Sequence, residues 1–223
     1  GLRFDRLTLF GSKVPIVTSD GAGVRSGGAI VVQSTSGPLH VDALVDAHGP
    51  LLLQTLGAAQ DLILNAPVRT QAGDLSLLSA GGIQQASTVA AGIAESGHSV
   101  DIQTFGGPLS MTPLARTTTL GGSINVNAAG SIALGQLDAR SLVDRVLNGV
   151  DDQSQWGDVS LTTVGSISDA TNGARVNLFG NDLTLRVNSG RIGLESAGIT
   201  MPLRIDAVTV AVDGPSDIAL QDE

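Results

Sequence analysis

The chain repeats one short pattern along most of its length: a glycine, then alternating apolar and polar residues. Clear copies are GDLSLLSAGGI (73–83), GSINVNAAGSIAL (122–134) and GDVSLTTVGSI (157–167). Most copies begin about two dozen positions after the one before, a spacing typical of a solenoid, in which each turn stacks on its neighbours. The first apolar residues of successive copies are Ile30, Leu51, Leu75, Val100, Ile124, Val159 and Val176.

Within one unit the first segment reads as a β-strand. Val159 and Leu161 fall on one face and Asp158 and Ser160 on the other, which is the two-residue period of a strand. A glycine turn and a second short strand follow. A unit this short cannot bury its own apolar face, so we expect equivalent strands to pair in parallel from turn to turn. The sequence therefore predicts an all-β, right-handed parallel β-helix, because parallel crossovers are overwhelmingly right-handed.

The rival fold is a pair of β-sandwiches of about 100 residues each. It is disfavoured because sandwich strands do not recur as similar segments at a regular spacing. Composition agrees with the β-helix: aromatic residues make up only 2% of the chain and 29 of its 223 residues are glycine. A narrow β-helix interior is filled by Leu, Ile, Val and Ala, with glycine at corners that need positive φ or close backbone approach.

Charge and cysteine content exclude several functional classes. The net charge is −9 with a single lysine, Lys13, so no basic surface is available for nucleic acid or an anionic membrane. With no cysteine, the chain has no disulfide, thiolate metal site or cysteine nucleophile. No stretch of the sequence is apolar over the length that would predict membrane insertion. We interpret residues 1–223 as a single β-helix segment of a longer protein, since the chain starts at glycine and neither end reads as a cap.

The long step between Ile124 and Val159 predicts an insertion at about residues 138–158. DARSLVDRVLNG (138–149) predicts a short helix with Asp138 as N-cap, Gly149 as its C-terminal stop and a weak Arg140–Asp144 pair. Its apolar residues share one face and are Leu142, Val143, Val146 and Leu147. In one interpretation the insertion contacts a partner through Trp156, Leu142 and Val146, with Trp156 as an exposed anchor. In the other, which we favour, the apolar face covers a sheet and Trp156 packs beneath the loop.

No catalytic, cofactor-binding or metal site is predicted. The three histidines, His40, His48 and His98, have no partners at metal-ligand spacing. Asp151, Asp152 and Asp158 have oxygens suited to Ca²⁺ but lack the order of a dedicated loop, so we interpret them as turn residues. Acidic pairs able to line up on one face, as glycoside cleavage requires, are Asp42 with Asp46 and Asp206 with Asp213.

The repeats GDLSLLSAGGIQQASTVAAG, GSINVNAAGSIAL and GDVSLTTVGSISDA resemble the shafts of large bacterial exoproteins of the filamentous-haemagglutinin type. The tail GRIGLESAGITMPLRIDAVTVAVDGPSDIALQDE (190–223) is similar to a unit of giant bacterial surface proteins. The resemblance covers most of residues 28–223 and concerns architecture. It implies a right-handed β-helix that is extracellular or on the bacterial cell surface and often adhesive, with no catalytic residues to carry over.

Three functions follow as hypotheses. The first is a structural and adhesive shaft segment of a large secreted or cell-surface bacterial protein, without catalysis or cofactor. Its partners would be neighbouring β-helix segments of the same parent protein and host or cell-surface glycans or proteins. The second is a carbohydrate-active β-helix enzyme, a polysaccharide lyase or hydrolase. The third is a scaffold subunit that binds partner proteins through residues 138–158.

Overall fold

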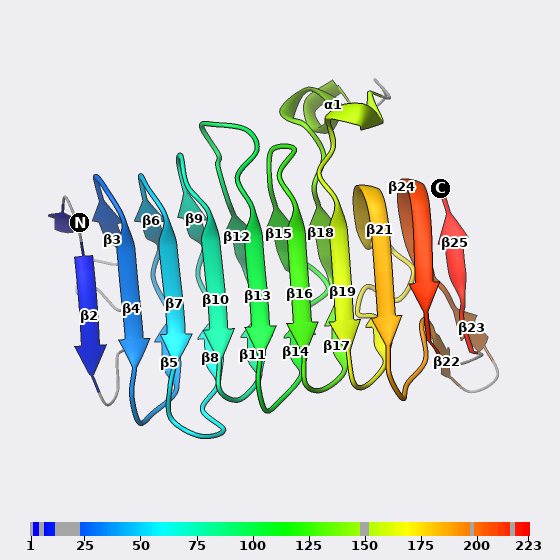
Figure 1. Ribbon diagram of the computed structural model, residues 1–223, viewed down its shortest axis with the longest axis horizontal. Coiled ribbons are helices and arrows are strands. Elements are labelled where there is room, and N and C mark those ends of the chain that lie inside the picture. Colours follow the sequence, from blue (N-terminus) through cyan, green and yellow to red (C-terminus); the bar gives the residue numbers. More distant parts are fainter. Residues whose placement is uncertain (1, 5–6, 12–22, 148–151, 197–198, 215–216) are drawn as a thin grey trace.

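The computed structural model describes residues 2–4, 7–11, 23–147, 152–196, 199–214 and 217–223. They form a parallel β-solenoid of about seven turns, elongated along the stacking axis (Figure 1). In Figure 1 the front strands run downwards, the chain returns upwards behind them, and each turn advances to the right. The coil is therefore right-handed, and the predicted fold class is confirmed.

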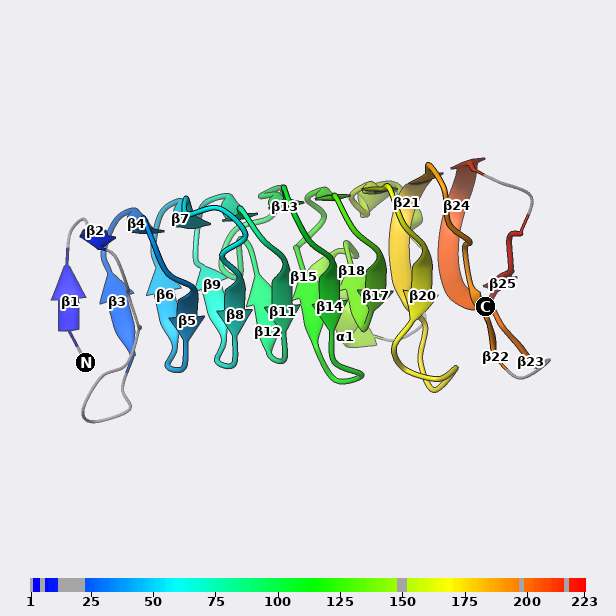
Figure 2. The ribbon, with the colours of Figure 1, turned by 90° about the horizontal axis from the view of Figure 1, so that it is seen from below.

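Three faces run along the solenoid, as Figure 2 shows from below. The first face contains β2 (Leu7–Gly11), β4 (Ile30–Ser34), β7 (Leu51–Thr55), β10 (Leu75–Ser79), β13 (Val100–Thr104), β16 (Ile124–Ala128) and β19 (Val159–Thr163). The second contains β5 (Leu39–Val41), β8 (Leu62–Leu64), β11 (Ile83–Gln85), β14 (Leu109–Met111), β17 (Ile132–Leu134) and β20 (Ile167–Asp169). The third contains β1 (Leu2–Phe4), β3 (Val24–Ser26), β6 (Val45–Ala47), β9 (Val68–Thr70), β12 (Thr88–Ala90), β15 (Arg116–Thr118) and β18 (Gln136–Asp138).

Two long strands join the third face to the first near the C-terminus. β21 (Leu178–Val187) pairs with β18 at its start and with β19 at its end, and β24 (Leu203–Asp213) follows β21. β25 (Leu220–Asp222) pairs only with the beginning of β24. β22 (Leu194–Ser196) and β23 (Ile199–Met201) form the antiparallel pair; the other described ladders are parallel. The insertion contributes the helix α1 (Leu142–Leu147) and the 3₁₀ turn η1 (Gln153–Gln155).

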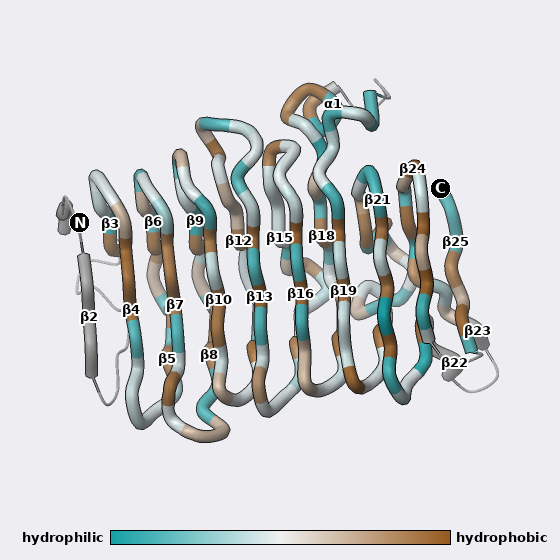
Figure 3. Tube along the Cα trace, viewed as in Figure 1, coloured by the Kyte–Doolittle hydropathy of each residue, from teal (hydrophilic) through white to brown (hydrophobic). Residues whose placement is uncertain are grey.

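Aliphatic ladders fill the interior. Hydrophobic and hydrophilic positions alternate along the strands, as Figure 3 shows, and the apolar set points inward. Backbone register stacks one such set from turn to turn, and all its members are at most 3% exposed: Leu53, Leu77, Ile102, Val126, Leu161 and Leu185. Burying each of these side chains contributes about 1.5–3 kcal/mol.

Glycines precede the first-face strands because the turns approach too closely there for a side chain. A Cβ on Gly122 would lie 2.0 Å from the carbonyl oxygen of His98, and one on Gly157 would lie 2.1 Å from that of Gly122. A Cβ on Gly73 would similarly meet the carbonyl carbon of Gly49 at 2.5 Å. Close backbone approach therefore explains why the repeat begins with glycine.

Buried hydroxyl groups close the corners. Ser34 donates to the carbonyl of Gly37 at 2.6 Å, and Ser79 donates to that of Gly82 at 2.8 Å. Three further threonines, each buried, donate to the carbonyl of a glycine at position i+3: Thr70, Thr104 and Thr119. The carbonyls of Gly82 and Gly107 also accept backbone N–H groups, from Leu62 and Gly130. Each hydroxyl bond contributes about 0.5–1.5 kcal/mol to the stability of its corner.

The structure corrects one alignment. The predicted last step, from Val159 to Val176, is wrong, because Val159 pairs in register with Leu183. Val176 precedes β21, and its carbonyl accepts a hydrogen bond from Gln136 at 2.9 Å. The long step before it is real, since Ile124 and Val159 are register partners on β16 and β19.

Candidate functional site

The predicted insertion projects from the corner between the third and first faces, above β18 and β19 in Figure 1. Its helix begins at Leu142 and not at Asp138, because Asp138 is the last residue of β18 and its backbone pairs with Thr118 and Phe179. The N-cap is Ser141, whose hydroxyl accepts the Asp144 N–H at 3.2 Å. The predicted stop, Gly149, lies outside the described residues.

A buried ion cluster anchors the insertion to the solenoid. Asp138 is 1% exposed, and its carboxylate accepts from Arg140 Nε at 3.0 Å and Nη2 at 2.9 Å. Arg145 Nε lies 3.4 Å from the same carboxylate. Burial alone would raise the pKa of Asp138, but the Arg140 hydrogen bond and both arginine charges outweigh it and hold this pKa below its ordinary value. The predicted Arg140–Asp144 pair is wrong, since Arg140 engages Asp138.

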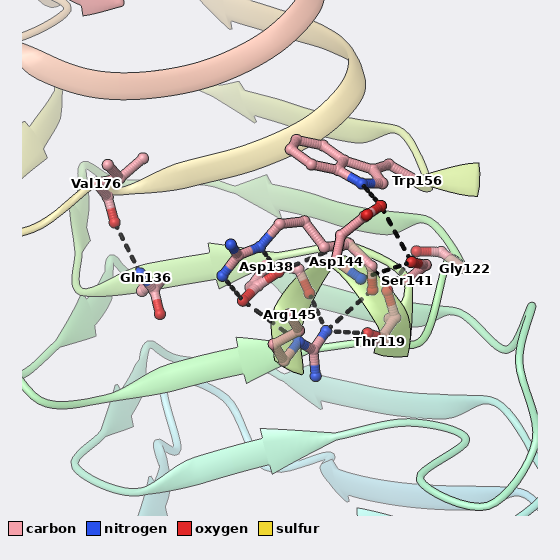
Figure 4. Close-up of polar contacts among 10 residues, drawn as sticks. Thr119, Gly122, Gln136, Asp138, Ser141, Asp144, Arg145, Trp156 and Val176 are labelled. Atoms are coloured by element: carbon pink, nitrogen blue, oxygen red, sulfur yellow. Dashed lines mark hydrogen bonds and ion pairs between the residues drawn. The ribbon is translucent and has the colours of Figure 1, made fainter. Parts of the chain in front are cut away.

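Arg145 ties α1 to the backbone below it (Figure 4). Its Nη2 donates to the carbonyl of Thr119, to that of Asp138 at 3.1 Å and to that of Arg140 at 3.2 Å. Burial lowers the pKa of Arg145, and the negative charge of Asp138 opposes that shift. A charged residue of the helix therefore faces the solenoid.

Trp156 packs beneath the insertion. It is 6% exposed, its indole N–H donates to the Asp144 carboxylate, and its ring meets Phe179 edge-on with centroids 6.4 Å apart. The guanidinium carbon of Arg140 lies over the same phenyl ring, 3.7 Å from its centroid. The structure thus excludes Trp156 as an exposed anchor, and the favoured placement of this residue is confirmed.

We expected the apolar face of α1 to cover a sheet, but the three of its side chains that the structure describes are exposed. Leu142 is 55% exposed, Val143 56% and Val146 69%. Asp144 and Arg145 occupy the inner side because they reach Trp156 and Asp138. Leu142 and Val146, two of the three predicted contact residues, remain available to a partner, while the surroundings of Leu147 are outside the described residues.

The two residues of the first acidic pair considered for the enzyme hypothesis, Asp42 and Asp46, each have partners of their own and do not share a site. Asp46 lies in a ladder on the third face, 3.0 Å from Arg69 Nη2 and 3.9 Å from Arg25 Nε. Burial alone would raise the pKa of Asp46, but hydrogen bonds from Arg69 and Gln71 and the arginine charges hold it below its ordinary value. Asp42, beyond β5 on the second face, accepts from Asn65 at 2.7 Å.

The two residues of the second acidic pair, Asp206 and Asp213, lie at different places on β24. Asp206 accepts from Gln153 at 3.0 Å near the third face, and Asp213 ends the strand on the first face, beside Arg186. Neither pair therefore converges on a common point, as two carboxylates acting on one glycosidic bond must.

The calcium and histidine candidates occupy corners. Asp158 accepts from the Asp182 N–H at 3.3 Å, Asp152 is exposed beside η1, and Asp151 lies outside the described residues. His98 lies between two exposed carboxylates, with Nδ1 3.6 Å from Asp74 and Nε2 3.6 Å from Glu95. His40 is on β5, and His48 is exposed in the turn after β6. No three potential metal ligands gather anywhere in the described ranges.

Sequence reasoning missed two features near this corner. The ion cluster around Asp138 was missed because the sequence predicted Asp138 as a helix N-cap, although the segment GQLDA is also compatible with a strand. The outward orientation of the apolar residues of α1 carried no signal in the sequence, because it depends on the contacts of Asp144 with Trp156 and of Arg145 with Asp138.

No protein-family model, curated protein or solved structure matches the chain. In the part of the chain that the structure describes, no helix has the length and apolar character needed to cross a membrane.

Proposed function

We propose that this chain is a structural and adhesive shaft segment of a large bacterial protein that is secreted or held on the cell surface. It provides length and stiffness through parallel stacking, catalyses no reaction, and joins neighbouring β-helix segments of the same parent protein end to end. The resemblance of its repeats to exoprotein shafts supports this assignment. The exposed Leu142, Val143 and Val146 supply a contact surface for host or cell-surface glycans or proteins.

The observation that carries the proposal is the open edge of β24. β25 pairs with β24 only over Leu203–Ile205, and no described strand pairs with the rest of that edge, from 206 to 213. Val210 continues the inward ladder of Leu183, yet it is 41% exposed whereas Leu183 is 1% exposed. An unpaired edge with open apolar positions is a template for another strand.

The edge suits one more turn of the same kind. Asp222 pairs with Ile205, and Ile205 pairs with Leu178, so residues added after Glu223 would follow the path of residues 180–187. A parallel strand there would bury the ladder positions and satisfy the backbone groups of β24. The stability of a solenoid is approximately the sum of its repeats and of the contacts between neighbouring repeats. Each added turn therefore extends the shaft through the same kind of contact.

The test is to append a copy of residues 180–190, GNDLTLRVNSG, directly after Glu223. In the register of β21 and β24, its two leucines would lie beside Val210 and Val212. We expect slower hydrogen exchange in β24 and a higher melting temperature than the parent chain shows. The matched control is the same extension with both leucines replaced by serine, which should give no gain. Equal exchange in all three proteins would refute β24 as a docking edge.

A further inference from the structure

The outer surface of the first face carries almost no charge between β4 and β19. These strands lie side by side in Figure 1, and no segment that the structure describes crosses in front of them. Register stacks the outward residue at the fourth position of each strand into one uncharged outer row: Gln33, Gln54, Leu78, Gln103, Asn127 and Thr162. At the second position of these strands the only charged residue is Asp101. An anionic partner therefore finds no positive charge along this part of the face.

An apolar row runs beside the outer row, at the corner where the first-face strands end. Its members are Leu56, Ala80, Phe105, Ala129 and Val164. Phe105 is 58% exposed, Leu56 50% and Val164 49%. Backbone hydrogen bonds continue the ladder into this row, as from the Phe105 N–H to the carbonyl of Ser79 at 2.8 Å. The two rows together form a strip that is polar along one side and apolar along the other.

Two neighbouring amides of the outer row have hydrogen-bonding capacity to spare. Gln103 on β13 and Asn127 on β16 are register partners, and neither side chain forms a hydrogen bond with another described residue. Gln33, by contrast, donates to Gln54 at 2.6 Å. Each free amide offers two N–H donors and a carbonyl acceptor. Because Phe105 follows Gln103 by two residues, free amides and an exposed ring occur together in the middle of the strip.

The dimensions of this surface suit one extended chain better than a second solenoid. The six strands from β4 to β19 span about 24 Å along the axis, and a five-residue strand is about 17 Å long. The resulting area of roughly 400 Å² is about half of the 800 Å² that each partner buries in a stable protein complex.

We propose that the first face binds a single uncharged β-1,4-linked polysaccharide chain that lies along the solenoid axis. A pyranose ring has hydroxyl groups at its edge and C–H groups on its faces. The hydroxyls exchange hydrogen bonds with Gln103, Asn127 and Thr162, while the C–H groups pack on Phe105 and the rest of the apolar row. Such a chain rises per sugar by a length similar to the strand spacing, so successive sugars meet equivalent positions on successive turns.

Charge selects the class of polysaccharide. Asp101 and the net charge of −9 disfavour an anionic chain, and no cationic side chain occurs in either row of the strip. The inference rests on the proposed adhesive role in that it names one partner class for it. It uses neither α1 nor the β24 edge, so the glycan-binding test and the β24 extension test can fail separately.

The probe is cellohexaose, measured by calorimetry. The matched control is the β-1,4-linked hexamer of glucuronate, which has a carboxylate in place of each CH₂OH group. We expect saturable binding of cellohexaose that changes little with salt, and at least tenfold weaker binding of the glucuronate hexamer. No saturable binding of cellohexaose, or equal binding of the two hexamers, would overturn the proposal.

Exposed side chains allow the site to be located without loss of folding. Gln103→Ala and Phe105→Ala should each weaken cellohexaose binding at least fivefold. The matched controls are Gln84→Ala, an exposed amide on the second face, and Leu114→Ala, which is 69% exposed in the loop after β14. Both controls should leave the affinity unchanged, and unaltered circular dichroism melts would confirm that all four variants fold. Binding that survives the double variant of Gln103 and Phe105, or that is lost in Gln84→Ala instead, would place the glycan elsewhere and refute the assignment.

Discussion

Leu161 offers the sharpest test of the aliphatic ladders. It is 0% exposed on β19 and is stacked in register between Val126 on β16 and Leu185 on β21. Leu161→Ala removes three carbons, worth about 2 kcal/mol of transfer free energy. A remaining cavity of roughly 70 Å³ would add about 1.7 kcal/mol. Since backbone ladders hold β19 on both sides, little relaxation is available, and we expect a loss of about 4 kcal/mol in the free energy of unfolding.

The assay is urea denaturation followed by circular dichroism, with Ser160→Ala as the matched control. Ser160 is the neighbouring residue on the same strand and points outward, so its truncation should change the free energy of unfolding by less than about 0.5 kcal/mol. A cost below about 1.5 kcal/mol for Leu161→Ala, or equal costs for the two variants, would refute the assignment of inner and outer faces.

Two further predictions concern the corner and the ion cluster. Gly157→Ala should lower the melting temperature by several degrees, because the added Cβ would overlap the carbonyl oxygen of Gly122. The control Ser154→Ala, at an exposed site nearby, should leave the melting temperature unchanged. Equal melting temperatures for the two variants would contradict the close approach of the turns at Gly157. Asp138 has a lowered pKa in the folded state, so its stabilising contribution is complete above the unfolded value of 3.8 and is lost as the pH falls below it. Thermal melts should therefore show a steeper acid destabilisation in the parent chain than in Asp138→Asn, and parallel curves would count against the cluster.

The fold was readable from the chain because its determinants are local and repeated. Alternation in segments such as VSLTT marks the inward residues, and the preceding glycine marks the corner where two turns touch. Each turn then needs only its neighbours, so a pattern seen several times predicts the whole architecture. The alignment of the repeats failed at Val176, because the sequence of the loop before β21 resembles the start of a strand.

The candidate sites depended on contacts that no local pattern encodes. Apolar spacing in α1 predicted a buried face, but Arg145 pairs with Asp138 and Asp144 accepts from the Trp156 indole, so the charged side of the helix faces inward. A hollow lined by Leu142, Val143 and Asp144 forms where this helix stands next to the loops after β12 and β15, which come two turns and one turn earlier in the chain. Repeated short-range periodicity therefore specified the solenoid, whereas long-range pairing of single side chains decided which surface it presents.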